Sequence, residues 1–370
     1  MTVRPQVGKP LQQAISLANS GKGAAAMSKL HEAESVGGLT GAEQAAISQA
    51  RQFIAVKTGA GGSSLGCKAK FANDYNAGRY HDVVGADASC LRKAGGFDFQ
   101  SQVIVAQAYY LMGDYRTAIT LLRGLGNSDQ VLSLLMSAAA KSGDTQTEGQ
   151  VAERLILQGQ SKYWTYLLTA TDAMRGLSDH ANLDIYRIRF ATGNMRNTDD
   201  YELMTELALE LHFPTEAVTV AQKGFDVKLL QGDRDTRLLT KAQAEAAKDT
   251  ANLAKTQQQA NKSKSGDDLV SYGENLWGRG QFPDALNAVQ AGIKKGGLSK
   301  PAEAQISLGI VQAGAGQKPA AIATFNAVKG DPAAQAVAHL WSVYTRSGGG
   351  APASSGASAS NAGTGKKRHR

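Results

Sequence analysis

The chain has 370 residues, enough for two ordinary domains or one extended repeat array with a sizeable core. Hydrophobic residues make up 42% of it and aromatic residues only 6%, which favours many small, closely packed helices over one aromatic-rich core. No run of about 18 apolar residues occurs, which excludes a membrane-spanning helix; the formal net charge of +8 includes four charges in the last five residues, so the rest of the chain is not strongly basic.

Residues 1–160 are predicted to form an N-terminal array of helix hairpins. In "GDYRTAIT", Gly113 follows an apolar run and precedes Ala118 by five residues, and the same spacing recurs at Gly21 and Ala26. A glycine allows a tight turn, and the small residue lets two helices cross closely. Because each helix has a single apolar stripe, a hairpin must stack on its neighbours to bury it.

The pattern is weaker in two hairpins of this array and in the segment that follows it. Around Gly78 and Gly143, Val83 and Glu148 replace the small residue of the second helix. Residues 161–240 have clear helical periodicity without the full spacing, so we expect degenerate helical hairpins there.

The C-terminal half returns to the pattern. Residues 241–265 are nearly all strong helix formers with few large apolar residues, so we expect an exposed connecting helix. A C-terminal array is predicted over residues 266–346, where Gly280 and Gly316 lie 36 residues apart and each precedes an alanine by five residues. Residues 347–370 contain little that could be buried, and we expect a disordered basic tail.

The period and the order of residues resemble the tetratricopeptide repeat, whose pattern W-x2-L-G-x2-Y…A-x3-F…P recurs every 34 residues or so. That resemblance implies an all-α fold, a right-handed superhelical solenoid of TPR-like helix hairpins. No alternation of apolar and polar residues indicates a strand.

A closer resemblance covers most of residues 3–346. It rests on "VRPQVGKPLQQA", on "LSDHANLDIYRIRFATGNMRNTDDYELM" and on "QAGIKKGGLSKPAEAQISLGIVQAGAGQKPAAIATFNAVKGD". These stretches are similar to a proteobacterial family of secreted or periplasmic tetratricopeptide-repeat proteins without an assigned enzymatic activity. The resemblance implies a periplasmic or secreted location. The residues alone show no signal peptide, so a cytoplasmic location is the alternative.

The two cysteines give an independent indication of compartment. Cys67 and Cys90 lie symmetrically about the predicted turn at Gly78, which puts them at similar heights on facing helices, where a disulfide can form. A disulfide would favour an oxidising compartment. Two buried free thiols are the alternative.

The inner side of such a superhelix is the expected binding groove. Counting from the turn glycines gives eight partner-binding candidates: Val103, Gln107, Tyr110, Val270, Glu274, Trp277, Ile306 and Ile310. Tyr110 and Trp277 would be good anchors, although packing between neighbouring hairpins is an equal alternative for them. The candidates lack the Lys and Asn typical of grooves that clamp a terminal carboxylate.

We find no sequence signature of catalysis. C-x-x-C, H-E-x-x-H and EF-hand patterns do not occur, and the six histidines are scattered. We therefore expect no metal, no cofactor and no enzymatic activity.

The predicted function is a non-catalytic scaffold or adaptor that binds another protein or peptide in its groove. One alternative is a structural solenoid that associates with itself. Another is an electrostatic binder of an anionic polymer or surface through the basic tail, that is, through Lys366, Lys367, Arg368 and Arg370. The modest charge of the rest of the chain argues against nucleic acid as the partner.

Overall fold

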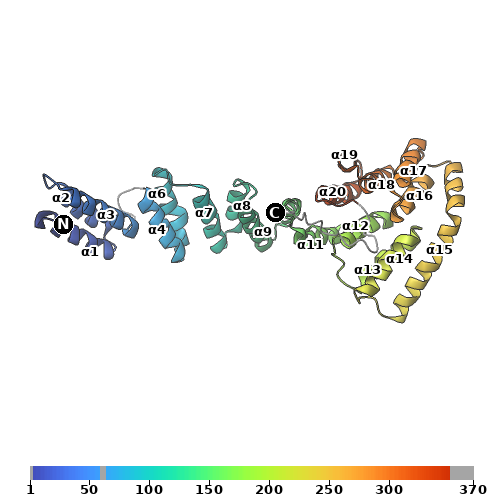
Figure 1. Cartoon of the computed structure of the whole chain (residues 1–370), viewed down its shortest axis with the longest axis horizontal. Coiled ribbons are helices and arrows are strands. Elements are labelled where there is room, and N and C mark those ends of the chain that lie inside the picture. The colour runs from blue at the N-terminus through green and yellow to red at the C-terminus, as the bar shows by residue number, and fades with distance from the viewer. Residues whose placement is uncertain (1–2, 59–63, 351–370) are drawn as a thin grey trace, which may run out of the picture. The chain divides into compact units, whose positions relative to one another are not determined.

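The structure, a computed structural model, describes residues 3–58 and 64–350 (Figure 1). Within these ranges all regular structure is helical and no strand occurs, so the prediction of an all-α fold is confirmed. None of the helices in them combines the length and the apolar character needed to cross a membrane. From residue 351 onward the predicted disordered tail lies outside the described residues.

The chain divides into two compact units, Met1–Val151 and Ala152–Arg370. The division falls inside helix α10 (Thr145–Leu157), nine residues before the boundary at residue 160 that the repeat pattern suggests. The position at which the repeat pattern weakens in the sequence therefore differs from the boundary between the two compact units.

The first unit is a succession of short helices in which α1 packs on α2, α3 on α4 and α7 on α8. The bounds are α1 Pro5–Asn19, α2 Gly23–Glu34, α3 Gly41–Thr58, α4 Ser64–Asn76, α5 Tyr80–Asp82, α6 Ala88–Lys93, α7 Phe99–Leu111, α8 Tyr115–Arg123 and α9 Asp129–Ser142. Small residues stand where the paired helices meet: Ala14 and Ala26 are completely buried in the first pair, and Ala106 and Ala118 in the α7–α8 pair.

The turn within the α7–α8 pair is made by Gly113, whose φ is 83°. A residue with a Cβ atom rarely adopts this left-handed conformation. The backbone N–H of Asp114 donates to the carbonyl of Tyr109 at 3.0 Å, which closes the end of α7, and the Asp114 side chain accepts from the backbone N–H of Thr117 and caps α8. "GDYRTAIT" is thus a helix end, a turn and a helix start in succession.

The hairpin around Gly78 is less regular. Val83, at the position that carries alanine in the regular hairpins, is completely buried, and the helix from Val83 to Asp87 is π-wound between α5 and α6. A cystine joins Cys67 on α4 to Cys90 on α6, with an S–S distance of 1.93 Å. The two sequence-predicted partners therefore lie on facing segments of this hairpin.

The second unit contains three hairpins, α13–α14, α16–α17 and α18–α19, together with α12, the long helix α15 and the closing helix α20. The bounds are α11 Trp164–Thr169, α12 Asp179–Ala191, α13 Thr198–Glu210, α14 Pro214–Asp226, α15 Asp233–Lys262, α16 Asp267–Gly278, α17 Phe282–Lys295, α18 Pro301–Gly314, α19 Lys318–Asn326 and α20 Pro332–Arg346. α20 packs on α18, α19 and α12.

The hairpins of this unit depend on glycines at the helix crossings. A Cβ atom on Gly273 of α16 would stand 2.8 Å from the carbonyl oxygen of Ala285 on α17, and one on Gly309 of α18 would stand 2.3 Å from the Phe325 ring on α19. Both distances are shorter than real Cβ contacts, so the α17 backbone approaches Gly273, and the Phe325 ring approaches Gly309, as closely as glycine allows. The core beside them holds Trp277 and Trp341, whose rings lie 6.3 Å apart in an edge-to-face arrangement.

Candidate functional site

Most of the predicted groove residues are buried in the structure. Six of the eight are 7% exposed or less: Val103, Val270, Glu274, Trp277, Ile306 and Ile310. Gln107 and Tyr110 are partly exposed, and the Tyr110 ring lies 5.4 Å from the ring of Tyr115. The six buried residues are not accessible to a partner in this structure. Of the two expected anchors, Trp277 is packed in the core, and Tyr110 is partly exposed.

In the second unit, helix α12 covers the groove positions. Its Arg187 guanidinium lies 5.1 Å from the Trp277 ring, and the Nε2 atom of His180 is 2.7 Å from a carboxylate oxygen of Glu274. Ile185 and Ile188 belong to the same hydrophobic cluster as Trp277, Ile306 and Ile310. Helix α12 therefore covers the surface that the repeat pattern predicts to be a peptide-binding groove.

A buried ion cluster holds α12 in this place. Arg187 donates two hydrogen bonds to Glu216 on α14, at 2.9 and 2.7 Å, and a third to Asp184 at 2.8 Å. Its Nη1 atom is 3.9 Å from Glu274 on α16, whose other carboxylate oxygen accepts a hydrogen bond from Ser307 on α18. One arginine thus joins three helices, and the serine adds a fourth.

The protonation states follow from these contacts. Burial alone would lower the pKa of His180, but the carboxylates of Glu274 and Asp184 outweigh it and raise this pKa well above the ordinary value. Burial would raise the pKa of Glu274, yet His180 and Arg187 lower it. At neutral pH the cluster therefore contains a charged His180 imidazolium and the Arg187 guanidinium beside the ionised carboxylate of Glu274.

A serine, a carboxylate and a histidine in contact invite a catalytic interpretation, which their burial opposes. Glu274 and Ser307 are each 1% exposed. A nucleophile or base needs to reach a substrate atom, and these two groups are enclosed by helices α12, α16 and α18. We interpret the cluster as the clasp that fixes α12.

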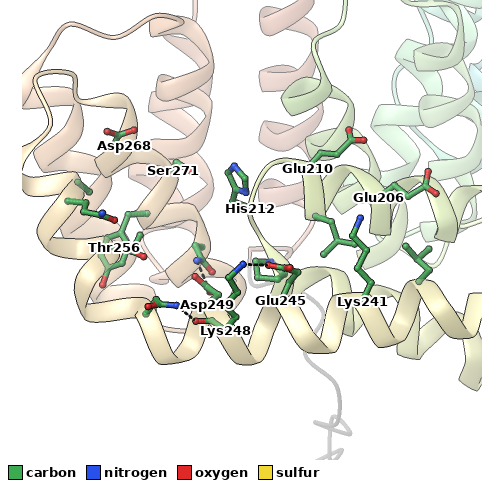
Figure 2. Close-up of a pocket in the computed structure, with 18 residues that line it drawn as sticks. Glu206, Glu210, His212, Lys241, Glu245, Lys248, Asp249, Thr256, Asp268 and Ser271 are labelled. Carbon is green, nitrogen blue, oxygen red and sulfur yellow. Dashed lines mark hydrogen bonds and ion pairs between the residues drawn. The ribbon is translucent and has the colours of Figure 1, made fainter.

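The second unit also has an open cleft of about 940 Å³, here called the α15 cleft. α15 runs along it, and the α13–α14 hairpin and α16 form its two sides (Figure 2). The lining residues are Glu206, Leu209, Glu210, His212, Pro214, Leu238, Lys241, Glu245, Lys248, Asp249, Asn252, Thr256, Gln259, Ala260, Asp268, Ser271, Tyr272 and Asn275. This volume is at the upper end of the range typical of ligand-binding clefts, about 300–1,000 Å³.

The lining of the α15 cleft has more acidic than basic side chains: five carboxylates and two lysines. Three carboxylates have cationic partners. Glu206 lies 3.4 Å from Arg234 and Glu245 lies 3.6 Å from Lys248, while Asp249 pairs with Arg279.

Two carboxylates of the lining have no side-chain partner in the described part of the chain. Within the described part of the chain, neither the side chain of Glu210 nor that of Asp268 has a hydrogen bond or an ion pair, and both residues are exposed. Glu210 is the last residue of α13, where the helix dipole is negative, and Glu206 precedes it by one turn. Figure 2 shows Glu210 and Asp268 on opposite sides of the cleft. The arrangement favours a ligand that brings positive charge.

His212 lies between these two sides in Figure 2 and makes the turn from α13 to α14. It is exposed and has a φ of 65°, in the left-handed region that glycine occupies in the other hairpins. The backbone N–H of Phe213 donates to the carbonyl of Ala208 at 2.7 Å, the same closing bond as at Gly113. His212 therefore stands at a turn-glycine position and directs an imidazole into the cleft.

The spacing between turn residues is a feature of the sequence that points to this site but did not enter the sequence-based predictions. Gly280 follows His212 by 68 residues, which is two periods of about 34 residues. The repeat pattern would predict one further hairpin in this interval, where the structure has α15. The expected connecting helix at 241–265 is found at Asp233–Lys262, but it also packs on α13, α14 and α16 and so forms one wall of a cleft.

The first unit has a smaller charged group beside the cystine. Lys70 on α4 donates to Asp74 and to Asp87, at 2.5 and 2.7 Å, and Asp74 also pairs with Arg79. Burial would raise the pKa of Asp74, but the hydrogen bonds from Lys70 and Arg79 lower it to about 2. This group ties α4 to the π-wound segment.

No protein-family model matches the chain, and no curated protein matches its sequence. Among residues 3–58 and 64–350, no three His, Cys, Asp or Glu side chains are grouped in a way that could hold a metal ion. The tail residues Lys366, Lys367, Arg368 and Arg370 lie outside the described residues.

Proposed function

We propose that the chain is a non-catalytic scaffold or adaptor and that the α15 cleft is its binding site for a cationic segment of another protein. The observation that carries the proposal is the pair of carboxylates, Glu210 and Asp268, that have no side-chain partner in the described ranges and lie on opposite sides of a cleft of about 940 Å³. A lysine or arginine side chain of a ligand would supply the missing charge to each. Amides and hydroxyls along the cleft, such as Asn252, Thr256 and Ser271, can pair with a peptide backbone.

We also propose that the hairpins are tetratricopeptide repeats in a right-handed solenoid. The turn glycines with positive φ and the glycine and alanine residues at the helix crossings support this assignment. In such a solenoid the usual partner is a polypeptide. The α12 clasp closes the ordinary groove in the second unit, so a partner would use the opening made by α15.

A periplasmic or secreted location is part of the proposal. The cystine between Cys67 and Cys90 supports it, because disulfides persist in oxidising compartments and are rare in the cytoplasm. Thiol titration of denatured, unreduced protein from its native cells should find no free thiol.

A binding titration tests the proposed site. The probe is a fluorescein-labelled peptide of alternating lysine and glycine, followed by fluorescence anisotropy with the full chain, and a glutamate–glycine peptide serves as the negative probe. Glu210→Gln combined with Asp268→Asn should weaken lysine-probe binding about three- to tenfold, since exposed charge pairs contribute roughly 0.2–1 kcal/mol each.

The matched control changes the same charge elsewhere. Asp82→Asn with Asp284→Asn removes two exposed carboxylates that do not line the cleft and have no side-chain partner in the described ranges. It should leave probe binding within twofold of wild type. Equal weakening by both double variants would mean that general electrostatics, rather than the cleft, holds the probe, and would contradict the proposal.

A further inference from the structure

The last five residues of the chain have the chemistry that the α15 cleft lacks. Lys366, Lys367, Arg368 and Arg370 carry four positive charges with no acidic residue among them. Residues 351–365 contain no charged, aromatic or large aliphatic residue. Any ion pair made by the segment after Gly350 therefore has to come from its basic end.

The segment begins in the same unit as the cleft. The backbone N–H of Gly349 donates to the carbonyl of Tyr344 at 2.9 Å, and Lys318 donates to the carbonyl of Gly348 at 2.7 Å, so the chain is held against α19 and α20 up to that point. Gly350 itself is buried. The starting point of the segment is thus fixed within the second unit.

The length of the segment is sufficient for it to reach the cleft. Lys366 follows Gly350 by 16 residues. Sixteen residues can span at most about 55 Å. A compact unit of this size has a radius of gyration of about 16 Å, so a surface cleft of the same unit lies within that limit.

We propose that the basic tail, residues 366–370, is an intramolecular occupant of the α15 cleft and competes there with a partner's cationic segment. Glu210 and Asp268 receive the tail's positive charges, and a partner must displace the tail to bind. The inference rests on the proposed function of the cleft. A tether of this length gives an effective concentration on the order of 1 mM, so even a tail of weak intrinsic affinity occupies the site.

The experiment compares two full-length proteins with one probe. The first protein is wild type, and the second carries Lys366→Ala, Lys367→Ala, Arg368→Ala and Arg370→Ala. The probe is the labelled peptide GTGKKRHR, the sequence of residues 363–370, and binding is measured by anisotropy. A third protein controls for net charge: it loses four exposed lysines elsewhere, at Lys9, Lys22, Lys93 and Lys329.

The tail variant should bind the probe more tightly than wild type. With an intrinsic dissociation constant K measured on the tail variant, the wild-type constant should be larger by a factor of about 1 + (1 mM)/K, about tenfold if K is about 0.1 mM. The charge control should bind as wild type does. Adding Glu210→Gln and Asp268→Asn to both proteins should reduce the difference between them from about tenfold to about two- to fourfold, because the three- to tenfold weaker site also holds the tail less tightly.

Two results would overturn the inference. Equal affinity of wild type and the tail variant, with both affinities reduced by Glu210→Gln and Asp268→Asn, would leave the cleft as a cation site and remove the tail as its occupant. A wild-type constant that rises with protein concentration would assign the tail to the cleft of a second copy. If neither the tail peptide nor the lysine–glycine probe binds at all, the proposed function fails together with the inference.

Discussion

Replacing Arg187 with methionine should unfold the second unit at a much lower temperature. The substitution removes two hydrogen bonds to Glu216 and one to Asp184, and of the three buried carboxylates only Asp184 and Glu274 keep His180 as a cationic neighbour among the ion pairs of the described residues. Removing one partner of a buried ion pair costs about 3–5 kcal/mol. For a unit of about 200 residues this corresponds to a decrease in Tm of roughly 10 °C, because each kcal/mol lowers Tm by about 2–4 °C.

Tryptophan fluorescence gives a selective assay for this effect. The three tryptophans, Trp164, Trp277 and Trp341, all belong to the second unit, so their emission follows that unit and not the first. Arg187 lies over the Trp277 ring, so its loss should also change the native emission. Thermal unfolding is measured by emission, with far-ultraviolet circular dichroism reporting both units.

The control is Arg234→Met. Arg234 pairs with Glu202 and Glu206, at 3.3 and 3.4 Å, but its side chain is 67% exposed. Exposed pairs contribute about 0–1 kcal/mol, so this variant should unfold within about 3 °C of wild type. If Arg187→Met also unfolds within that interval, the ion cluster does not fix α12 and the explanation for the closed groove is wrong.

Three further predictions concern the crossings, the cystine and the histidine. Gly273→Ala should destabilise the second unit by about 1–3 kcal/mol in thermal unfolding, because the added methyl group overpacks against α17. The control is Gly278→Ala on the same helix, which should change the stability little, since a Cβ there would stand 3.6 Å from its nearest neighbour. Cys67→Ala with Cys90→Ala should lower the free energy of unfolding of the first unit by about 3 kcal/mol and leave the tryptophan transition unchanged. Because the folded-state pKa of His180 is raised, its stabilising contribution is complete below pH 6.5 and is lost as pH rises through the folded pKa. The difference in free energy of unfolding between wild type and His180→Gln, measured by urea titration, should therefore shrink between pH 6 and pH 10. A difference that grows with pH would contradict this assignment.

Local features of the sequence predicted the hairpins well because their causes are local. A turn needs a residue at positive φ, and Gly113 and Gly280 supply it at the expected places. The crossing of α16 and α17 needs a residue without a side chain, and Gly273 supplies it. Such requirements act within about 30 residues and therefore leave a pattern that can be counted.

The position of α12 could not be predicted in the same way. It depends on contacts between Arg187 and side chains such as Glu216 and Glu274, which lie 29 and 87 residues further along the chain. Periodicity shows that a segment is helical, but it does not show which surface the helix covers. For this reason, counting from the turn glycines placed Glu274 and Trp277 on an open groove, whereas both are buried in the structure.

The α15 cleft was hidden for a related reason. A helix with few large apolar residues is rightly expected to be exposed, and most of α15 is exposed. Its small buried residues, Ala242 and Ala260, are the points where it contacts the hairpins, and alanine is too common in this chain to mark them. His212 is the residue that could have indicated the cleft, since it takes a turn position that glycine holds in other hairpins.

The most direct test of the cleft as a binding site is zero-length cross-linking. A carbodiimide joins a lysine amine to a carboxylate that contacts it, so the full-length protein is treated with the lysine–glycine peptide and the modified carboxylates are identified by mass spectrometry. The account predicts that Glu210 and Asp268 are the principal sites and that an excess of unlabelled GTGKKRHR suppresses both. Cross-links spread evenly over exposed carboxylates, or concentrated in the first unit, would contradict it.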